Sequence, residues 1–343
     1  MPARTPGPGS TPSAPRKPAP AGDALAAGHQ AYARGDLAGA LALYEKALAA
    51  QPTDAKLHLV VGLTLQQLGR LGDARRHYAE AATHDPKTAK PHLMLAALQL
   101  GDEDWDGARA SLETAVKLSP RMSMAHFYLG QVYRRQGDYV RAEVHLKRAE
   151  ADLKDFPPLL HQLGAVKFEA GDKAGALSYF QAATKAQPKD PASWTSLGLA
   201  YAANNDWRKA IEGHRRAAEL APKDPAIYFR LGWLLYKAGD LAESETCMRE
   251  AIRRDPAYVP AHFDLGLILG RLGKLAEAQK AFETVLKLQP GNADAKFWLG
   301  CTLSAEGQKE EARTKFKELA DIDPGNELIQ ATLAAFDASA IQA

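Results

Sequence analysis

The chain has 343 residues, which exceeds the size at which one compact core usually stops growing, so we expect several domains or an elongated repeat array. Its 46% hydrophobic and 24% charged residues are typical of a folded protein and exclude disorder over most of the length. The 43 basic and 41 acidic residues nearly cancel, and a formal net charge of +2 gives no general attraction to nucleic acid or an anionic membrane.

The start of the chain differs in composition from the rest. Residues 1–20 contain seven prolines and no large apolar side chain after Met1, so we predict a disordered, proline-rich tail. Two P-x-x-P spacings occur there, and whether the tail binds a partner or only solubilises the chain stays open. The tail lacks the apolar core of a signal peptide, and no apolar run of about 18 residues follows. We expect a cytoplasmic protein without direct membrane insertion, and the distant cysteines Cys247 and Cys301 fit a reducing compartment.

From Ala21 onward, one pattern recurs every 34 residues without a change of length. Position 8 is glycine in eight of nine copies, position 20 is always alanine or serine, and position 32 is proline in eight of nine. The apolar residues between them fall at helical spacing, so each copy predicts a helix, a turn and a second helix. The predicted repeats are 21–54, 55–88, 89–122, 123–156, 157–190, 191–224, 225–258, 259–292 and 293–326.

Each fixed position has a mechanical reason. We expect the small residues at positions 8 and 20 to let the two helices of a repeat cross at short range. Proline at position 32 ends the second helix, while glycine at 15 and aspartate at 16 supply a left-handed turn residue and the cap of the second helix. The predicted caps of first helices are Asp54, Thr88, Asp190, Asp224 and Asn292.

In the sixth copy the pattern comprises Trp194, Leu197, Gly198, Tyr201, Ala210, Ala217 and Pro222. This series resembles the tetratricopeptide repeat (TPR) signature, and all nine copies show most of it. The resemblance implies an all-α fold, a TPR-like α-solenoid in which antiparallel helix pairs form a right-handed superhelix. It also implies that positions 2, 5, 6, 9, 12 and 13 of the first helices line the concave wall.

One further helix is predicted after the ninth copy. Asn326 is its expected cap, and the helix should run from Glu327 to about Phe336 with one apolar face. Terminal repeats of a solenoid expose a hydrophobic flank, so we expect residues 327–343 to form a capping helix and a tail.

Catalytic chemistry is not indicated in the array. The connections are too short for a lid or a phosphate-binding loop, and nucleotide-binding and nucleophile-elbow motifs do not occur. We therefore predict that the protein is not an enzyme and has no cofactor and no small-molecule substrate. His58, His92 and His126 recur at 34-residue intervals, but packed helices are about 8–10 Å apart, too far for shared zinc ligands. We interpret these histidines, and His262 at the same position, as packing residues and predict no metal site.

The concave positions of the last three copies carry apolar side chains that packing within a repeat does not require. They are Phe229, Trp233, Tyr236, Phe263, Leu267 and Phe297, together with Cys301. We hypothesise a groove for an apolar peptide or amphipathic helix, because aromatic anchors dominate binding energy at interfaces. The alternative, that the rings seal contacts between adjacent first helices, stays open. In the fourth copy the same wall carries Phe127, Gln131, Arg134 and Arg135, where arginine would suit an acidic or carboxylate-bearing segment.

Two specific ligands associated with the family do not fit this chain. The carboxylate clamp of chaperone co-factors has lysine at position 5, where this chain has leucine, phenylalanine, His161 or Thr195. The asparagine ladder of O-linked GlcNAc transferases is absent from position 6, and no glycosyltransferase domain follows the repeats. The resemblance therefore leaves the ligand to be inferred from this chain's own concave residues.

The sequence predicts a non-enzymatic scaffold or adaptor that binds a peptide or helical segment of other proteins on its concave face. The alternative is a regulatory subunit that recruits or restrains a separately encoded enzyme. Nucleic acid is not expected as a partner, because the net charge is close to zero.

Overall fold

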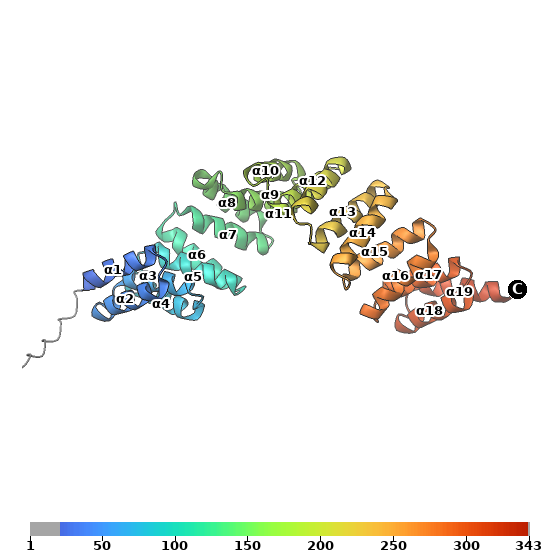
Figure 1. Ribbon diagram of the computed structural model, residues 1–343, viewed down its shortest axis with the longest axis horizontal. Helices are drawn as coiled ribbons and strands as arrows, with labels where there is room; N and C mark the ends of the chain where they lie inside the picture. The colour runs from blue at the N-terminus through green and yellow to red at the C-terminus, as the bar shows by residue number, and fades with distance from the viewer. Residues whose placement is uncertain (1–20, 342–343) are drawn as a thin grey trace, which may run out of the picture. The chain divides into compact units, whose positions relative to one another are not determined.

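The computed structural model describes residues 21–341, in which every regular element is a helix (Figure 1). The predicted proline-rich tail, residues 1–20, lies outside the described residues, as do residues 342–343. The chain divides into two compact units, unit 1 (Met1–Leu153) and unit 2 (Lys154–Ala343). The prediction of an all-α solenoid built from helix pairs is confirmed.

The helices follow one another in pairs, with an odd-numbered first helix and an even-numbered second helix. Unit 1 holds α1 (Ala21–Ala33), α2 (Leu37–Ala50), α3 (Ala55–Gln67), α4 (Leu71–His84), α5 (Ala89–Gly101), α6 (Trp105–Leu118), α7 (Ser123–Arg135) and α8 (Tyr139–Leu153). Unit 2 holds α9 (Pro157–Glu169), α10 (Lys173–Ala186), α11 (Pro191–Ala203), α12 (Trp207–Leu220), α13 (Pro225–Ala238), α14 (Leu241–Arg254), α15 (Val259–Arg271), α16 (Leu275–Leu288), α17 (Ala293–Ala305), α18 (Lys309–Ile322) and α19 (Glu327–Ile341). None of the described helices is both long and apolar enough to cross a membrane.

Side-chain caps begin many of these helices, as the sequence predicts. Six aspartates accept a hydrogen bond of 2.9 to 3.2 Å from the backbone N–H three residues later and so cap second helices: Asp36, Asp104, Asp138, Asp172, Asp206 and Asp240. Asp54, Asp190, Asp224 and Asn292 cap first helices by accepting from a backbone N–H two or three residues later. Thr88 is the residue before α5, as predicted, but its hydroxyl donates to Asp85 at 2.6 Å instead of accepting a hydrogen bond from the helix.

Inside each pair the chain turns through a residue in the left-handed region. Seven glycines take φ between 73° and 91° there, for example Gly35 and Gly239. The third and sixth pairs have Glu103 (φ 59°) and Asn205 (φ 60°) at the same place instead. A Cβ atom in this conformation lies too close to the following carbonyl, which costs about 1–2 kcal/mol for most residues. The turn is therefore imposed by the packing of the pair even where no glycine favours it.

The glycine in the middle of each first helix makes room for a large side chain of the second helix. A methyl group placed on Gly62 would lie 2.6 Å from Tyr78 Cε1, closer than any tolerable contact. The sequence-based explanation named the small residue at position 20, whose backbone is indeed near: a methyl group on Gly198 would lie 3.0 Å from the Ala210 carbonyl oxygen. The closer neighbour, however, is the large residue at position 24, which the sequence analysis did not single out.

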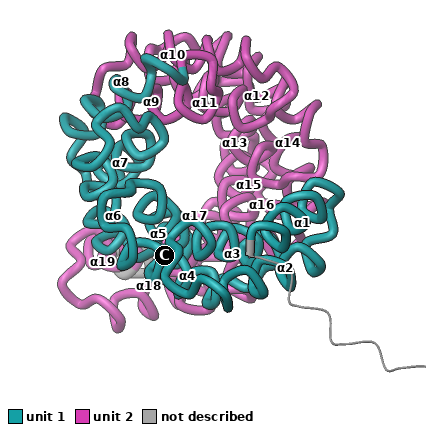
Figure 2. The backbone as a smooth tube through the Cα atoms, turned by 90° about the vertical axis from the view of Figure 1, so that its left-hand side faces the viewer, with its two compact units in different colours: residues 1–153 teal, residues 154–343 magenta. Residues whose placement is uncertain are grey.

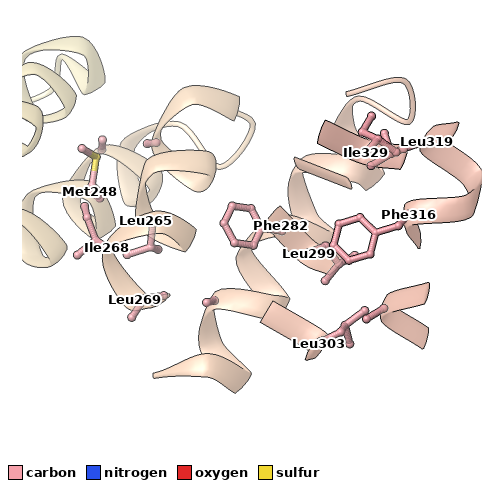
Figure 3. Close-up of a cluster of buried hydrophobic side chains, with 14 of the residues drawn as sticks. Met248, Leu265, Ile268, Leu269, Phe282, Leu299, Leu303, Phe316, Leu319 and Ile329 are labelled. Atoms are coloured by element: carbon pink, nitrogen blue, oxygen red, sulfur yellow. The ribbon is translucent and has the colours of Figure 1, made fainter. Parts of the chain in front are cut away.

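Buried hydrophobic side chains connect successive pairs within a unit. In unit 2 one cluster runs from α14 through the last two pairs into α19, and Figure 3 labels Met248, Leu265, Ile268, Leu269, Phe282, Leu299, Leu303, Phe316, Leu319 and Ile329. In unit 1 a corresponding cluster includes Leu41, Tyr44, Val61 and Tyr78. Each pair therefore shares its buried core with its neighbours, as in other repeat proteins.

The C-terminal helix α19 covers the end of this cluster. Asn326 Oδ1 accepts a hydrogen bond from the Ile329 backbone N–H at 3.2 Å, and Ile329 is buried. The Phe336 ring lies 5.5 Å from the Phe316 ring, centroid to centroid. The helix continues to Ile341, past the predicted end at Phe336.

A side chain at the fourth position of some first helices is hydrogen-bonded to the carbonyl of the proline six residues earlier, at the end of the preceding pair. The bonds run from His58 to Pro52, His126 to Pro120, Trp194 to Pro188 and His262 to Pro256 at 2.9 to 3.0 Å, and from Gln330 of α19 to Pro324 at 3.3 Å. Since a carbonyl only accepts, the ring or amide N–H donates in each case.

Candidate functional site

The first helices at the end of unit 2 stack side by side, since α13 contacts α15 and α15 contacts α17. Within unit 2, drawn in magenta in Figure 2, α11, α13 and α15 lie on the inner side of the curved tube and α10, α12 and α14 on the outer side. Residues three or four apart on one helix share a face, so side chains from the three helices form one surface. This inner strip consists of Phe229, Trp233, Tyr236, Phe263, Asp264, Leu267, Phe297, Trp298 and Cys301.

The three phenylalanines of the inner strip contact aromatic rings behind it. The ring centroids of Phe229 and Tyr258 are 5.6 Å apart, and both Phe263 with Phe282 and Phe297 with Phe316 make edge contacts within 6 Å. Each phenylalanine is half-buried and packs against the core cluster. These side chains therefore form the floor of the strip. Phe263 and Phe297 contact the second helix of their own repeat, so the expectation that packing within a repeat does not require these two rings is wrong.

The tryptophan, tyrosine and leucine side chains border open space. Trp233, Tyr236 and Leu267 line a pocket of about 240 Å³. Tyr236 and Leu267 also line a second pocket of about 520 Å³, whose other wall comes from α17. Since the two pockets share these side chains, they adjoin one another, and together their linings include residues of the three first helices.

Two members of the inner strip were not predicted as site residues. Trp298 is 42% exposed, comparable to Trp233 at 39%, and it lines the larger pocket together with Cys301. Asp264 lies between the smaller pocket and a third pocket of about 300 Å³ near the start of α17. Both occupy position 6, which the sequence analysis compared only with an asparagine ladder.

Two cations lie over the aromatic rings of the inner strip. Lys237 Nζ is 5.4 Å from the centroid of the Trp233 ring, and Arg271 Cζ is 4.7 Å from that of Tyr236. Both distances are within the range of cation–π attraction. Burial raises the pKa of the Asp264 carboxyl to about 6, against the lowering effect of nearby Lys237.

The structure places the other predicted site residues on α7 of unit 1. Phe127 is only 4% exposed and contacts the Tyr128 ring, so it has little surface to offer a partner. Gln131 and Arg134 are half-buried. Arg135 is exposed, with Cζ 5.7 Å from the centroid of the Trp105 ring.

Paired histidines occur in unit 1 without forming a metal centre. The Nδ1 atoms of His58 and His77 are 3.1 Å apart, and those of His126 and His145 are 2.9 Å apart. Among residues 21–341, no three potential metal ligands come together. The two thiols are free, and burial raises the pKa of both Cys247 and Cys301.

Family models match most of the chain. One tetratricopeptide repeat model matches residues 93–155, 161–225, 198–259, 229–278 and 263–327, and a second matches residues 31–98. The chain belongs to the tetratricopeptide repeat family. No curated protein matches this TPR chain in sequence.

Solved structures share the TPR fold at low identity. A tetratricopeptide repeat protein from Parabacteroides merdae is 20% identical, with a TM-score of 0.53 over 72% of this chain and 98% of that chain. The C-terminal part of a TPR protein from Cytophaga hutchinsonii is 13% identical, with a TM-score of 0.61 over 70% and 99%. The APC/C hetero-tetramer Cut9–Hcn1 is 17% identical, with a TM-score of 0.54 over 82% of this chain but only 55% of that chain. At these identities the likeness concerns the fold alone.

Proposed function

We propose that this TPR protein is a non-enzymatic scaffold or adaptor that binds a peptide or helical segment of a partner protein along the inner strip. The observation that carries the proposal is the exposure of two tryptophans, Trp233 at 39% and Trp298 at 42%, beside the adjoining pockets. Buried tryptophan and tyrosine side chains supply much of the binding energy of protein interfaces. Exposed rings next to pockets therefore favour a site where a partner completes their burial.

The shape of the strip suits a single segment with side chains at several points. The pockets of about 240 and 520 Å³ adjoin at Tyr236 and Leu267, and their linings include residues of α13, α15 and α17. A helix or extended peptide laid across these helices would insert one apolar side chain into each pocket. The phenylalanine floor, fixed by contacts with rings behind it, would be held in place before binding, which reduces the entropy lost on association.

Two further observations support an interaction role. Members of the TPR fold occur in assemblies, as in the hetero-tetramer of Cut9 with Hcn1. The connections between the helices of a pair in this chain are three or so residues long, for example Arg34 to Asp36 between α1 and α2, which leaves little backbone for a catalytic loop.

The test compares two double variants of the full chain. Trp233→Ala with Trp298→Ala removes the exposed anchors, whereas Leu288→Ala with Ile322→Ala removes two other exposed apolar side chains, which lie on second helices of the same unit. Partners are captured on each immobilised protein, quantified by mass spectrometry, and the strongest is measured again by calorimetry as a purified fragment. We expect affinity to fall about tenfold or more for the tryptophan variant and to be unchanged for the control. Equal affinity of both variants, with unchanged melting, would refute the proposed site.

A further inference from the structure

Asp264 is a carboxylate set among apolar side chains of the inner strip. Its side chain lines two pockets. Together with Asp264, the first pocket is lined by Trp233, Tyr236, Lys237, Met248, Leu267 and Ile268, and the second by Val259, Pro260, Phe263, Gln289, Asn292 and Asp294. The residue therefore borders the place where an apolar segment would lie.

This carboxylate has no hydrogen bond or ion pair to any residue among those that the structure describes. Its desolvation is marked, since burial raises its pKa to about 6 despite the opposing charge of Lys237. A half-buried carboxylate without a bonded partner destabilises the free protein, and a ligand that donates a charge-assisted hydrogen bond would remove that penalty. Perturbed acids in pockets are frequent at functional sites for this reason.

The charges around the inner strip are unevenly distributed. The pocket near the start of α17 contains the carboxylates of Asp264 and Asp294 and no cationic side chain. The opposite pocket contains Arg271, and the pocket between them contains Lys237. The strip thus changes from acidic, through aromatic, to basic as it crosses from the start of α17 toward the ends of α13 and α15.

At the acidic end of the strip, which contains Asp264 and Asp294, the carboxylates can bind a ligand. Lys237 and Arg271 already lie over the rings of Trp233 and Tyr236. Asp264 has no such partner among the described residues, and Asp294 is exposed in the first turn of α17. Charge complementarity therefore favours a ligand cation at this end over a ligand anion at the other.

We propose that the inner strip selects a partner segment carrying a lysine or arginine next to apolar side chains, with the cation bonded to Asp264 and the apolar groups in the adjoining pockets. This inference rests on the proposed function and names the chemistry of the segment that the site takes. The basic side chain enters the pocket shared with Asp294, away from Lys237. Its aliphatic stem lies against Phe263, whose ring lines the same pocket.

The probe is a library of random twelve-residue peptides displayed on phage and selected on the immobilised full-length protein. We expect the selected peptides to be enriched in lysine or arginine at a fixed spacing from an aromatic or aliphatic residue. The strongest peptide is then synthesised, and its affinity is measured at pH 7.5 for the wild type, Asp264→Asn and Asp321→Asn. Asp321 is an exposed aspartate of α18, so its variant makes the same change of net charge away from the strip.

We expect Asp264→Asn to weaken binding about tenfold and Asp321→Asn to leave it unchanged. Replacing the basic residue of the peptide by norleucine should weaken binding to the wild type to the same degree and have no further effect on Asp264→Asn. At pH 5 the wild type should also lose roughly tenfold in affinity, because Asp264 becomes protonated, whereas Asp264→Asn should change little. The charged groups that line the two pockets with Asp264 are Lys237 of α13 and Asp294 of α17.

The outcomes separate the two proposals. Peptides that bind the tryptophan-dependent strip without a basic preference, or equally well to Asp264→Asn, would overturn this inference and leave the scaffold function intact. Selection of acidic peptides that depend on Arg271 would show the opposite polarity and would also overturn it. Selection of no peptide at all would refute the proposed peptide site itself, and the inference with it.

Discussion

Replacing His214 by leucine should stabilise the protein. His214 lies in α12 and is fully buried (0% exposed), with Nδ1 3.0 Å from the carbonyl oxygen of Ala210. Its Nε2 atom is buried and has no hydrogen-bond partner. The fourth pair shows that leucine fits this environment, because Leu146 occupies the equivalent position against Gly130.

The expected gain has a part that does not depend on pH and a part that does. An unsatisfied buried polar atom costs about 1–3 kcal/mol, from which about 1 kcal/mol is subtracted for the lost bond to Ala210. Burial also lowers the pKa of His214 from 6.5 to about 4, so the folded state resists protonation. Above pH 6.5 His214 is neutral in both the folded and the unfolded state, and its protonation does not reduce the free energy of unfolding. As pH falls from 6.5 toward 4, the unfolded state binds a proton at His214 and the folded state does not, so the free energy of unfolding decreases. With about 1.4 kcal/mol per pKa unit, this loss is about 2 kcal/mol at pH 5.

The assay is urea unfolding of the full-length wild type and His214→Leu at pH 7 and pH 5, followed by circular dichroism. Hydrogen exchange of the α11 and α12 amides reports the same change locally. We expect the variant to be more stable by about 1 kcal/mol at pH 7 and by about 3 kcal/mol at pH 5. All other histidines are the same in both proteins, so the growth of the difference isolates His214. A difference that stays constant or shrinks on acidification would refute the argument.

Three further predictions follow from the helix pairs and the inner strip. Gly62→Ala should lower the free energy of unfolding by about 1–3 kcal/mol, because the added methyl group meets a buried ring. Gly72 has open space around it, so Gly72→Ala should raise the free energy of unfolding by about 0.5–1 kcal/mol. Equal effects of the two substitutions in denaturant titrations would contradict this explanation. Glu103→Gly should raise the free energy of unfolding by about 1 kcal/mol, because glycine adopts the left-handed conformation of this turn without strain. A lower unfolding midpoint of the variant would argue against strain at Glu103. Iodoacetamide should modify Cys301 before Cys247, because Cys247 is buried and burial raises its pKa to about 11. A partner peptide bound to the inner strip should slow the reaction at Cys301. If mass spectrometry of the digested protein finds Cys247 modified first, the assigned exposures are contradicted.

Much of the fold could be predicted because packing fixes a few positions in every pair. Glycine and alanine at constant spacing predicted the close crossing of helices, and aspartate before the second helix predicted its cap. The partner of the central glycine could not be predicted in the same way, since position 24 holds tyrosine, leucine, phenylalanine, histidine or methionine. Packing at position 24 constrains only the size of the side chain. A search for one recurring residue type does not detect a position that is constrained in this way.

The candidate site was predictable only in part, because exposure depends on what the neighbouring pair contributes. Phe127 and Phe229 occupy the same position in their pairs, yet Phe127 is buried while Phe229 is half-buried. Trp298 and Asp264 both stand at position 6 of their repeats, and neither matches the asparagine ladder with which that position was compared. Their importance comes from the pockets beside them, which form between helices and leave no signal in the periodicity.

The hydrogen bonds from the fourth position of first helices to proline carbonyls recur in every second helix pair, and we call two pairs linked by one of them a couple. Their donors His58, His126, Trp194, His262 and Gln330 are 68 residues apart, twice the repeat length. Each bond ties a pair to the one before it, so the couples are the first with the second, the third with the fourth, and onward to α19 with the ninth. The boundary between units, after Leu153, falls between two couples rather than within one. A segment of 68 residues moved within the array would therefore keep the donor and the acceptor of this hydrogen bond together, whereas excision of a single 34-residue repeat would remove one of the two.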